Sequence, residues 1–218
     1  MENRQDVLKK LKIKRPFENA GNNLRAKLTQ NPDFDPVSLF EWGSAMGMAV
    51  LELLKAVEQK FGVEGQQVCR EVMVGVGRRI AAEAMKDADI PPGMTPVELV
   101  SLIATWVNTR FYASLEKPRI INNSECNFDI LWCPHQDVYR PFDCRVQRYF
   151  VQGILEAARE AGIWQGFNVE VKSLIPAGAE TCHFRIWKAG AGEPADLWEK
   201  YTRQLEEKAM QRMPDPKM

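Results

Sequence analysis

The sequence predicts an α+β fold, with a helical N-terminal half packed on an antiparallel sheet of about four strands. Apolar residues recur at helical spacing up to about residue 114, and beyond it they alternate one by one. Two hairpin-like segments follow, with one long helical segment between them. Helices followed by strands are typical of α+β domains. We therefore expect a basic N-terminal arm (1–36), a single α+β domain (37–212) and a frayed tail (213–218).

The N-terminal half is expected to form three helices, over residues 37–60, 65–86 and 95–114. The first carries apolar residues over so wide a face that it should be well buried. Gly75 and Gly77 lie inside the second, where each costs about 1 kcal/mol against alanine. Such a cost indicates close approach of another helix or of a ligand. Thr95, Pro96 and Glu98 form the start signal of the third helix, a capping box with proline at its first position.

The second half is expected to form two hairpins and two helices. Strands are predicted over residues 119–122, 126–133, 168–175 and 180–188, and helices over residues 144–161 and from 194 onward. In the second strand, Phe128, Ile130 and Trp132 share one face. In the last strand, Cys182 should point inward and His183 outward, because successive side chains alternate.

Charge and composition exclude several classes of protein. Lys+Arg and Asp+Glu both number 29, and a general nucleic-acid binder would normally show an excess of positive charge. No apolar run approaches the roughly 18 residues that a membrane span needs, and the N-terminus lacks the core of a signal peptide. We therefore expect a cytoplasmic protein without membrane insertion. Its five cysteines should be reduced thiols.

The candidate catalytic residues are Cys133, His135 and Cys144. Cys144 falls in the first turn of a predicted helix beside Arg145 and Arg148, and both the helix start and the cations should lower the pKa of its thiol. His135 lies at a strand end and is a candidate base for activating Cys133 or Cys144. The alternative is that these cysteines are ordinary core residues.

Zinc is a second possibility. It takes thiolate, imidazole and carboxylate ligands, which Cys133, Cys144, Glu170 and Cys182 could supply if the two hairpins flank the helix. Paired Cys-x-x-Cys motifs are missing from the sequence. Also missing are a Gly-x-Ser-x-Gly elbow, a phosphate-binding glycine loop and a His-Glu-x-x-His motif, which weakens serine-hydrolase, nucleotide-binding and zincin readings.

A spaced pattern runs through the second half of the chain. Its members are Cys133, Pro134, Cys144, Gly166, Phe167, Asn168, Gly178, Cys182 and Phe184. In this pattern, and in the earlier segment Phe61 to Gly65, the chain resembles the L-2-amino-thiazoline-4-carboxylic acid hydrolase-like family over about residues 40 to 188. The resemblance implies hydrolysis of a C–N bond in a small cyclic amidine-like compound.

The arrangement also looks like the vinyl-reductase-type ligand-binding domains and, more distantly, subunits of vesicle-tethering complexes. Some of the former bind apolar molecules beside a zinc ion held by cysteines and a glutamate. This resemblance implies the metal ligands Cys144, Glu170 and Cys182. The chain has Ser173 about where a further cysteine would be expected.

Two functions follow as alternatives. In an enzyme, Cys133 or Cys144 would be the nucleophile and His135 the proton carrier, while Arg145 or Arg148 would bind a substrate carboxylate. In a non-catalytic binding module or sensor, an apolar pocket between helices and sheet would hold a small molecule. The aromatic residues expected to line that pocket are Phe128, Trp132, Phe150 and Phe184. Wide apolar helix faces also predict a homodimer.

Overall fold

Helices come first along the chain and the sheet follows, as predicted. The computed structural model describes residues 13–28, 30–193 and 197–212. Its helices are α2 (Glu18–Lys27), α3 (Val37–Met85), α4 (Pro96–Arg110), α5 (Arg145–Glu160) and α6 (Leu197–Gln211), with 3-10 helices at Pro141–Cys144 and Ile175–Ala177. Its strands are β1 (Leu115–Asn122), β2 (Glu125–Trp132), β3 (Phe167–Val171) and β4 (Cys182–Lys188). The first part of the predicted arm (1–12) and the predicted tail (213–218) lie outside the described residues.

The four strands form one antiparallel sheet in the order β1-β2-β4-β3, which confirms the predicted fold class. Phe128 of β2 lies opposite Phe184 of β4, and their rings stack with centroids 4.6 Å apart. Cys182 is buried on this inner face. His183 lies on the outer face, where its Nδ1 is 2.6 Å from Asp129 Oδ1. The predicted alternation of Cys182 and His183 is therefore confirmed.

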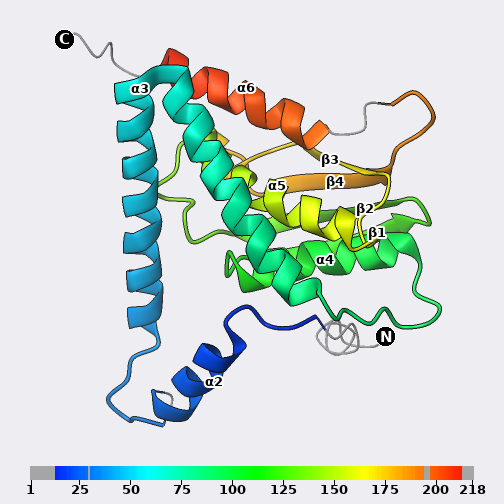
Figure 1. The fold of residues 1–218 in the computed structure, drawn as a ribbon, viewed down its shortest axis with the longest axis horizontal. Coiled ribbons are helices and arrows are strands. Elements are labelled where there is room, and N and C mark those ends of the chain that lie inside the picture. Colours follow the sequence, from blue (N-terminus) through cyan, green and yellow to red (C-terminus); the bar gives the residue numbers. More distant parts are fainter. Residues whose placement is uncertain (1–12, 29, 194–196, 213–218) are drawn as a thin grey trace.

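Helices cover one face of the sheet in two layers. Buried residues of α4 and α5 form one core with the inner faces of β2, β3 and β4. The second half of α3 then packs across α5, and α6 lies beside β3 (Figure 1). This core joins the two halves of the chain, and it places the start of α5 against the ends of β2 and β4.

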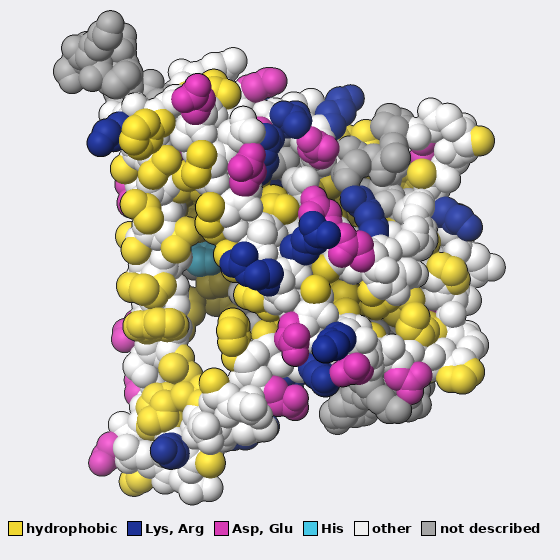
Figure 2. All heavy atoms as spheres, viewed as in Figure 1, with side chains coloured by type: hydrophobic (Ala, Val, Ile, Leu, Met, Phe, Trp, Pro, Cys, Tyr) yellow, Lys and Arg dark blue, Asp and Glu magenta, His cyan; other side chains and the backbone are white. Residues whose placement is uncertain are grey.

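Helix α3 consists of two segments that meet at a kink. Gly62 lies at φ 64° and ψ −140°, a conformation that favours glycine and that interrupts the helix. The segment before it, residues 37–61, is called the α3 arm from here on. It stands off the body at the side of the molecule, and its surface is rich in hydrophobic side chains (Figures 1 and 2).

The prediction that this first helix is well buried is wrong. In the arm, only Leu51, Leu54 and Glu58 are buried, all on the stripe that faces the body. Trp42 and Leu53 are each 67% exposed. An apolar side chain on every face of a helix indicates burial, but it does not say that the burying surface belongs to the same chain.

Helix α3 also corrects the expectation that no segment of the chain is apolar enough to span a membrane. By length and composition, α3 contains a window apolar enough to cross a bilayer, and 11% of that window is buried in the structure. The sequence prediction that no segment reaches this threshold is therefore wrong.

The capping signal of α4 is confirmed. The side chain of Glu98 accepts hydrogen bonds from the backbone N–H and the hydroxyl of Thr95, both at 2.7 Å, and Thr95 Oγ1 accepts one from the backbone N–H of Glu98 at 3.4 Å. Pro96 occupies the first helical position. These contacts set where α4 begins, and α4 forms one wall of the site described next.

Candidate functional site

A cavity of about 120 Å³ lies between the inner face of the sheet, α4, α5 and α6. Its lining is mostly apolar. The apolar lining includes Ile103, Val107, Phe128, Ile130, Val151, Leu155, Trp164, Val169, Leu174, Phe184, Ile186 and Trp198. Ligand pockets in proteins are commonly lined in this way, with a few polar groups that fix orientation.

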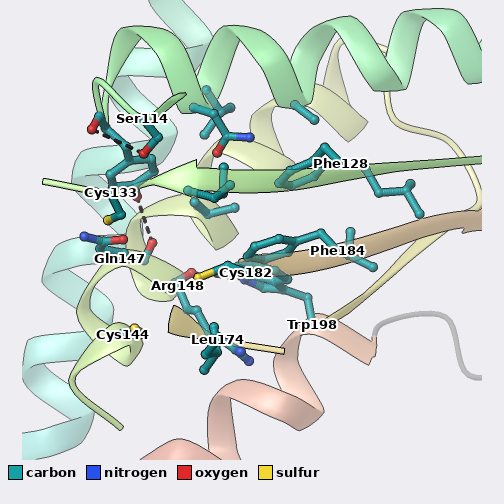
Figure 3. Close-up of a pocket in the computed structure, with 18 of the residues that line it drawn as sticks. Ser114, Phe128, Cys133, Cys144, Gln147, Arg148, Leu174, Cys182, Phe184 and Trp198 are labelled. Carbon is teal, nitrogen blue, oxygen red and sulfur yellow. Dashed lines mark hydrogen bonds between the residues drawn. The ribbon is translucent and has the colours of Figure 1, made fainter. Parts of the chain in front are cut away.

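The polar residues of the cavity gather towards one end. Ser114, Cys133, Gln147 and Cys144 lie at this end, where β2 leaves the sheet and α5 begins, whereas Phe128 and Phe184 lie at the other (Figure 3). This polarity follows from the chain path. β2 delivers Cys133 at its end, and the loop returns the chain to α5, whose first turns face back into the cavity.

Cys133, His135, Cys144, Arg148 and Cys182 all line this one cavity. The sequence analysis named each of them, and the structure brings them together. Phe128 and Phe184 also line it, as expected for an apolar pocket.

Trp132 and Phe150 are placed elsewhere. Trp132 ends β2 beyond the cavity, where its ring lies 6.0 Å from that of Phe40 in the α3 arm. Phe150 packs against Phe111 and Tyr112. Helical residues turn by about 100° each, so Phe150 projects to the side of α5 roughly opposite Arg148. The prediction that both rings line the pocket is wrong.

Arg145 is also placed outside the cavity. Its side chain is 1% exposed and forms a buried ion pair with Glu58 of the α3 arm through Nη2, with Nε 3.1 Å from Glu58 Oε1. Its Nη1 donates to the carbonyl of Phe142 at 3.0 Å. All three nitrogens of this guanidinium are engaged, and Arg145 is not among the residues that line the cavity, so its predicted substrate-binding role is wrong.

Burial determines the ionisation of the thiols. It raises the pKa of Cys144 to about 12 and also raises the pKa values of Cys133 and Cys182. Arg148 opposes the rise at Cys144 but does not reverse it. The prediction of a lowered pKa for Cys144 is therefore wrong, because loss of water outweighs both the helix start and the cation. All three thiols are neutral at pH 7.

His135 is one of the residues that line the cavity. Its ring stacks on Tyr139 with centroids 4.7 Å apart, and it lies against Gly47 of the α3 arm. Burial lowers the pKa of His135, so its imidazole is neutral at pH 7. The imidazole can accept a proton, but the thiols that line the same cavity keep theirs at pH 7.

The metal ligands implied by the resemblance do not converge. Val169 lines the cavity, and its neighbour Glu170 points to the other face of β3, where it pairs with Lys172 at 2.7 Å. Within residues 13–28, 30–193 and 197–212, no three His, Cys, Asp or Glu side chains are grouped so that they could hold a metal ion.

Several lining residues were not anticipated. Val151 and Leu155 follow Cys144 and Arg148 at helical spacing on α5, so the same periodicity that placed Arg148 indicates them. Ile103 and Val107 of α4 and Trp198 of α6 belong to elements far away in the sequence. No local pattern signals their part in the site.

The chain is similar to a protein of Archaeoglobus fulgidus. It is 47% identical over an alignment of 191 residues to this protein, which is described as uncharacterized, and the alignment covers 85% of each chain. No family model matches the chain.

One solved structure bears a low likeness. A trafficking protein particle complex subunit 3 from Naegleria fowleri, determined covalently bound to palmitic acid, aligns over 67% of this chain and 95% of that chain. The identity is 11% and the TM-score is 0.39. A likeness of this size carries no weight for ligand or assembly.

Proposed function

We propose that this chain, which belongs to the same family as the uncharacterized Archaeoglobus fulgidus protein, is a module that binds a small apolar molecule in the cavity between sheet and helices. The observation that carries this proposal is the cavity of about 120 Å³, lined mainly by aliphatic and aromatic side chains. An engineered apolar cavity of about 150 Å³ in another protein binds benzene, so this one suits a single ring or a short chain.

The ionisation of the polar groups supports binding over catalysis. The three thiols and the imidazole at the cavity are all neutral at pH 7, because burial disfavours their charged forms. A cysteine nucleophile reacts as a thiolate, and a neutral thiol in an apolar environment is inert. The same neutral groups add little cost to placing an apolar ligand beside them.

Binding is tested with neutral molecules such as indole and 3-phenylpropan-1-ol. We expect saturating ligand to raise the melting temperature, since a ligand at 100 times its Kd stabilises the folded state by about 2.7 kcal/mol. Ala104→Phe places a ring in the cavity and should abolish the shift. Ala82→Phe, at an exposed position of α3, should leave it intact. Equal shifts in both variants would show that these molecules bind elsewhere.

Hydrolysis of a C–N bond in a cyclic amidine is the second candidate function. The observation that favours it is the convergence of Cys133, His135 and Cys144 on one cavity, together with the resemblance of the chain to the thiazoline hydrolase-like family. This candidate needs a thiolate at neutral pH. It also needs turnover of 2-amino-thiazoline-4-carboxylate that is lost in Cys144→Ser or Cys133→Ser.

Alkylation measures the thiolate directly. We expect Cys144 to react with iodoacetamide at pH 7 far more slowly than a free thiol of pKa about 8.5, because burial raises its pKa to about 12. The rate should climb with pH throughout the alkaline range. Urea-unfolded protein serves as the reference in which all five thiols react. A Cys144 that reacts faster than a free thiol at pH 7 would return the hydrolase to first place.

Self-association through the α3 arm is also proposed. Leu39, Gly43, Met46, Val50, Leu53 and Val57 follow one another at alternating steps of four and three residues. None of these six residues is buried in the structure. These six residues form one stripe along the helix, called the seam from here on. A stripe with this spacing over about three heptads is typical of a helix that packs along another helix. At 1.5 Å per residue the arm is about 37 Å long, which gives two copies a long surface to share.

Light scattering tests the dimer. We expect twice the chain mass at micromolar concentration, and a monomer for Leu53→Glu, which places a charge in the seam. Val63→Glu, at an exposed site beyond the kink, is the matched control and should stay dimeric. A wild-type monomer at high micromolar concentration contradicts the proposal. Should that monomer sediment with lipid vesicles, the arm binds a bilayer instead.

A further inference from the structure

Two arginines on α5, three residues apart, are both buried but differ in their partners. Arg145 has the carboxylate of Glu58 and the carbonyl of Phe142. Arg148 is 6% exposed, and none of the described carboxylates forms an ion pair with it. Its Nη1 is buried without a hydrogen-bond partner among the described residues. A buried charge is normally paired, because an unpaired one is costly.

The side chain of Arg148 belongs to the cavity. It lies beside Cys182, Leu174 and Trp198, with its guanidinium carbon 5.3 Å from the centre of the Trp198 ring (Figure 3). The ring face offers a cation–π contact, which leaves the donors at the edge of the guanidinium unused. Burial lowers the pKa of Arg148 to about 10, so the group remains charged at pH 7.

Gln147, the residue before Arg148, carries a second donor without a partner in the described part of the chain. The Nε2 atom of Gln147 is also buried without a partner among the described residues, and Gln147 lines the same cavity. Buried polar groups in proteins are nearly always hydrogen-bonded, so two unpartnered donors at one cavity indicate that an acceptor belongs there. The rest of the lining is apolar or neutral and offers no anion to pair with the arginine.

We propose that the ligand of the cavity is a monoanionic carboxylic acid with an apolar body, whose carboxylate binds Arg148 and whose body lies against Phe128 and Phe184. This proposal rests on the proposed binding function and adds the chemical class of the ligand. A guanidinium matches a carboxylate with two parallel hydrogen bonds. One cation suits one negative charge, whereas a phosphate carries nearly two. The stacked pair of rings at the other end suits an aromatic ring or a short chain.

The test compares 3-phenylpropanoate with 3-phenylpropan-1-ol by isothermal titration calorimetry at pH 7. The two molecules share their body and differ in the charged group. We expect the wild-type protein to bind the acid roughly 10- to 100-fold more tightly, the range that hydrogen bonds to a charged group supply. In Arg148→Met the preference should disappear while the alcohol keeps its affinity within about threefold. Arg148→Lys should retain part of the preference.

Controls separate the two proposals. Arg79→Met removes an exposed arginine of α3 and should leave the preference unchanged. In the wild-type protein, lowering the pH to about 4 protonates the ligand and should shrink the preference, a readout that does not depend on any variant folding. Equal binding of acid and alcohol would overturn the carboxylate proposal and leave the apolar binding function standing. If neither molecule binds, both proposals fall.

Discussion

Replacing Glu58 by leucine lowers the free energy of unfolding by about 3 kcal/mol, because it leaves the guanidinium of Arg145 buried without its main partner. The side chains of Glu58 and Arg145 are 0% and 1% exposed. Removing one partner of such a pair typically costs 3–5 kcal/mol. Asp143, whose Oδ1 is 3.4 Å from Arg145 Nη1, keeps part of the compensation, so the expected loss falls at the lower end of that range.

Urea unfolding of four proteins measures this coupling: wild type, Glu58→Leu, Arg145→Met and the double variant. The double variant should recover at least half of the loss, since two apolar side chains need no partner. Glu160→Gln is the surface control. Its pair with Arg78 is about half-exposed on both sides, so its loss should stay within about 1 kcal/mol. Additive losses in the double variant would contradict a direct pair between Glu58 and Arg145.

The sheet was predictable because its signals are local. Alternation along residues 126–133 and 182–188 sets which side chains face the core, and the structure keeps that order in β2 and β4. The inward position of Cys182 follows from the same alternation. Cys133 does not, because alternation places it on the face opposite Phe128. It lines the cavity because β2 ends at Trp132 and the chain turns there.

The difference between Arg145 and Arg148 was not predictable from local pattern. Both lie in the first turns of one helix with the same charge. Their roles separate only because Glu58, 87 residues earlier in the chain, reaches Arg145. The prediction of a lowered pKa for Cys144 failed for a related reason. The helix start is visible in the sequence, but the burial that raises the pKa of this thiol depends on how distant parts of the chain pack around it.

The exposure of the α3 arm was missed because hydrophobic periodicity reports that a face is buried without saying by what. Leu51 and Leu54 are buried against the body, while Leu53, on a neighbouring face, is 67% exposed. A single sequence contains no signal that separates the two faces. The arm is therefore the element whose surroundings depend most on something outside this chain.

Gly153→Ala is expected to destabilise the protein by about 3 kcal/mol or more, because α3 and α5 cross at glycines. A Cβ on Gly153 would lie 2.0 Å from the carbonyl oxygen of Val74 and 2.6 Å from the backbone nitrogen of Arg78. A Cβ on Gly77 would lie 2.1 Å from the carbonyl oxygen of Phe150. Backbone atoms cannot turn away as a side chain can, so the helices must separate.

Gly75→Ala is the matched control on α3, the helix that crosses α5. The nearest atom to its added Cβ would be Arg79 Nη1 at 3.8 Å, an ordinary contact, so alanine should gain up to about 1 kcal/mol through helix propensity. Both variants are measured by urea unfolding at a common m-value, which excludes effects on the unfolded state. The expected result is a loss at position 153 and a gain at position 75. A Gly153→Ala protein within about 0.5 kcal/mol of wild type would mean that α3 and α5 do not approach as closely as described, and the wall that α5 forms in the cavity would then be misplaced.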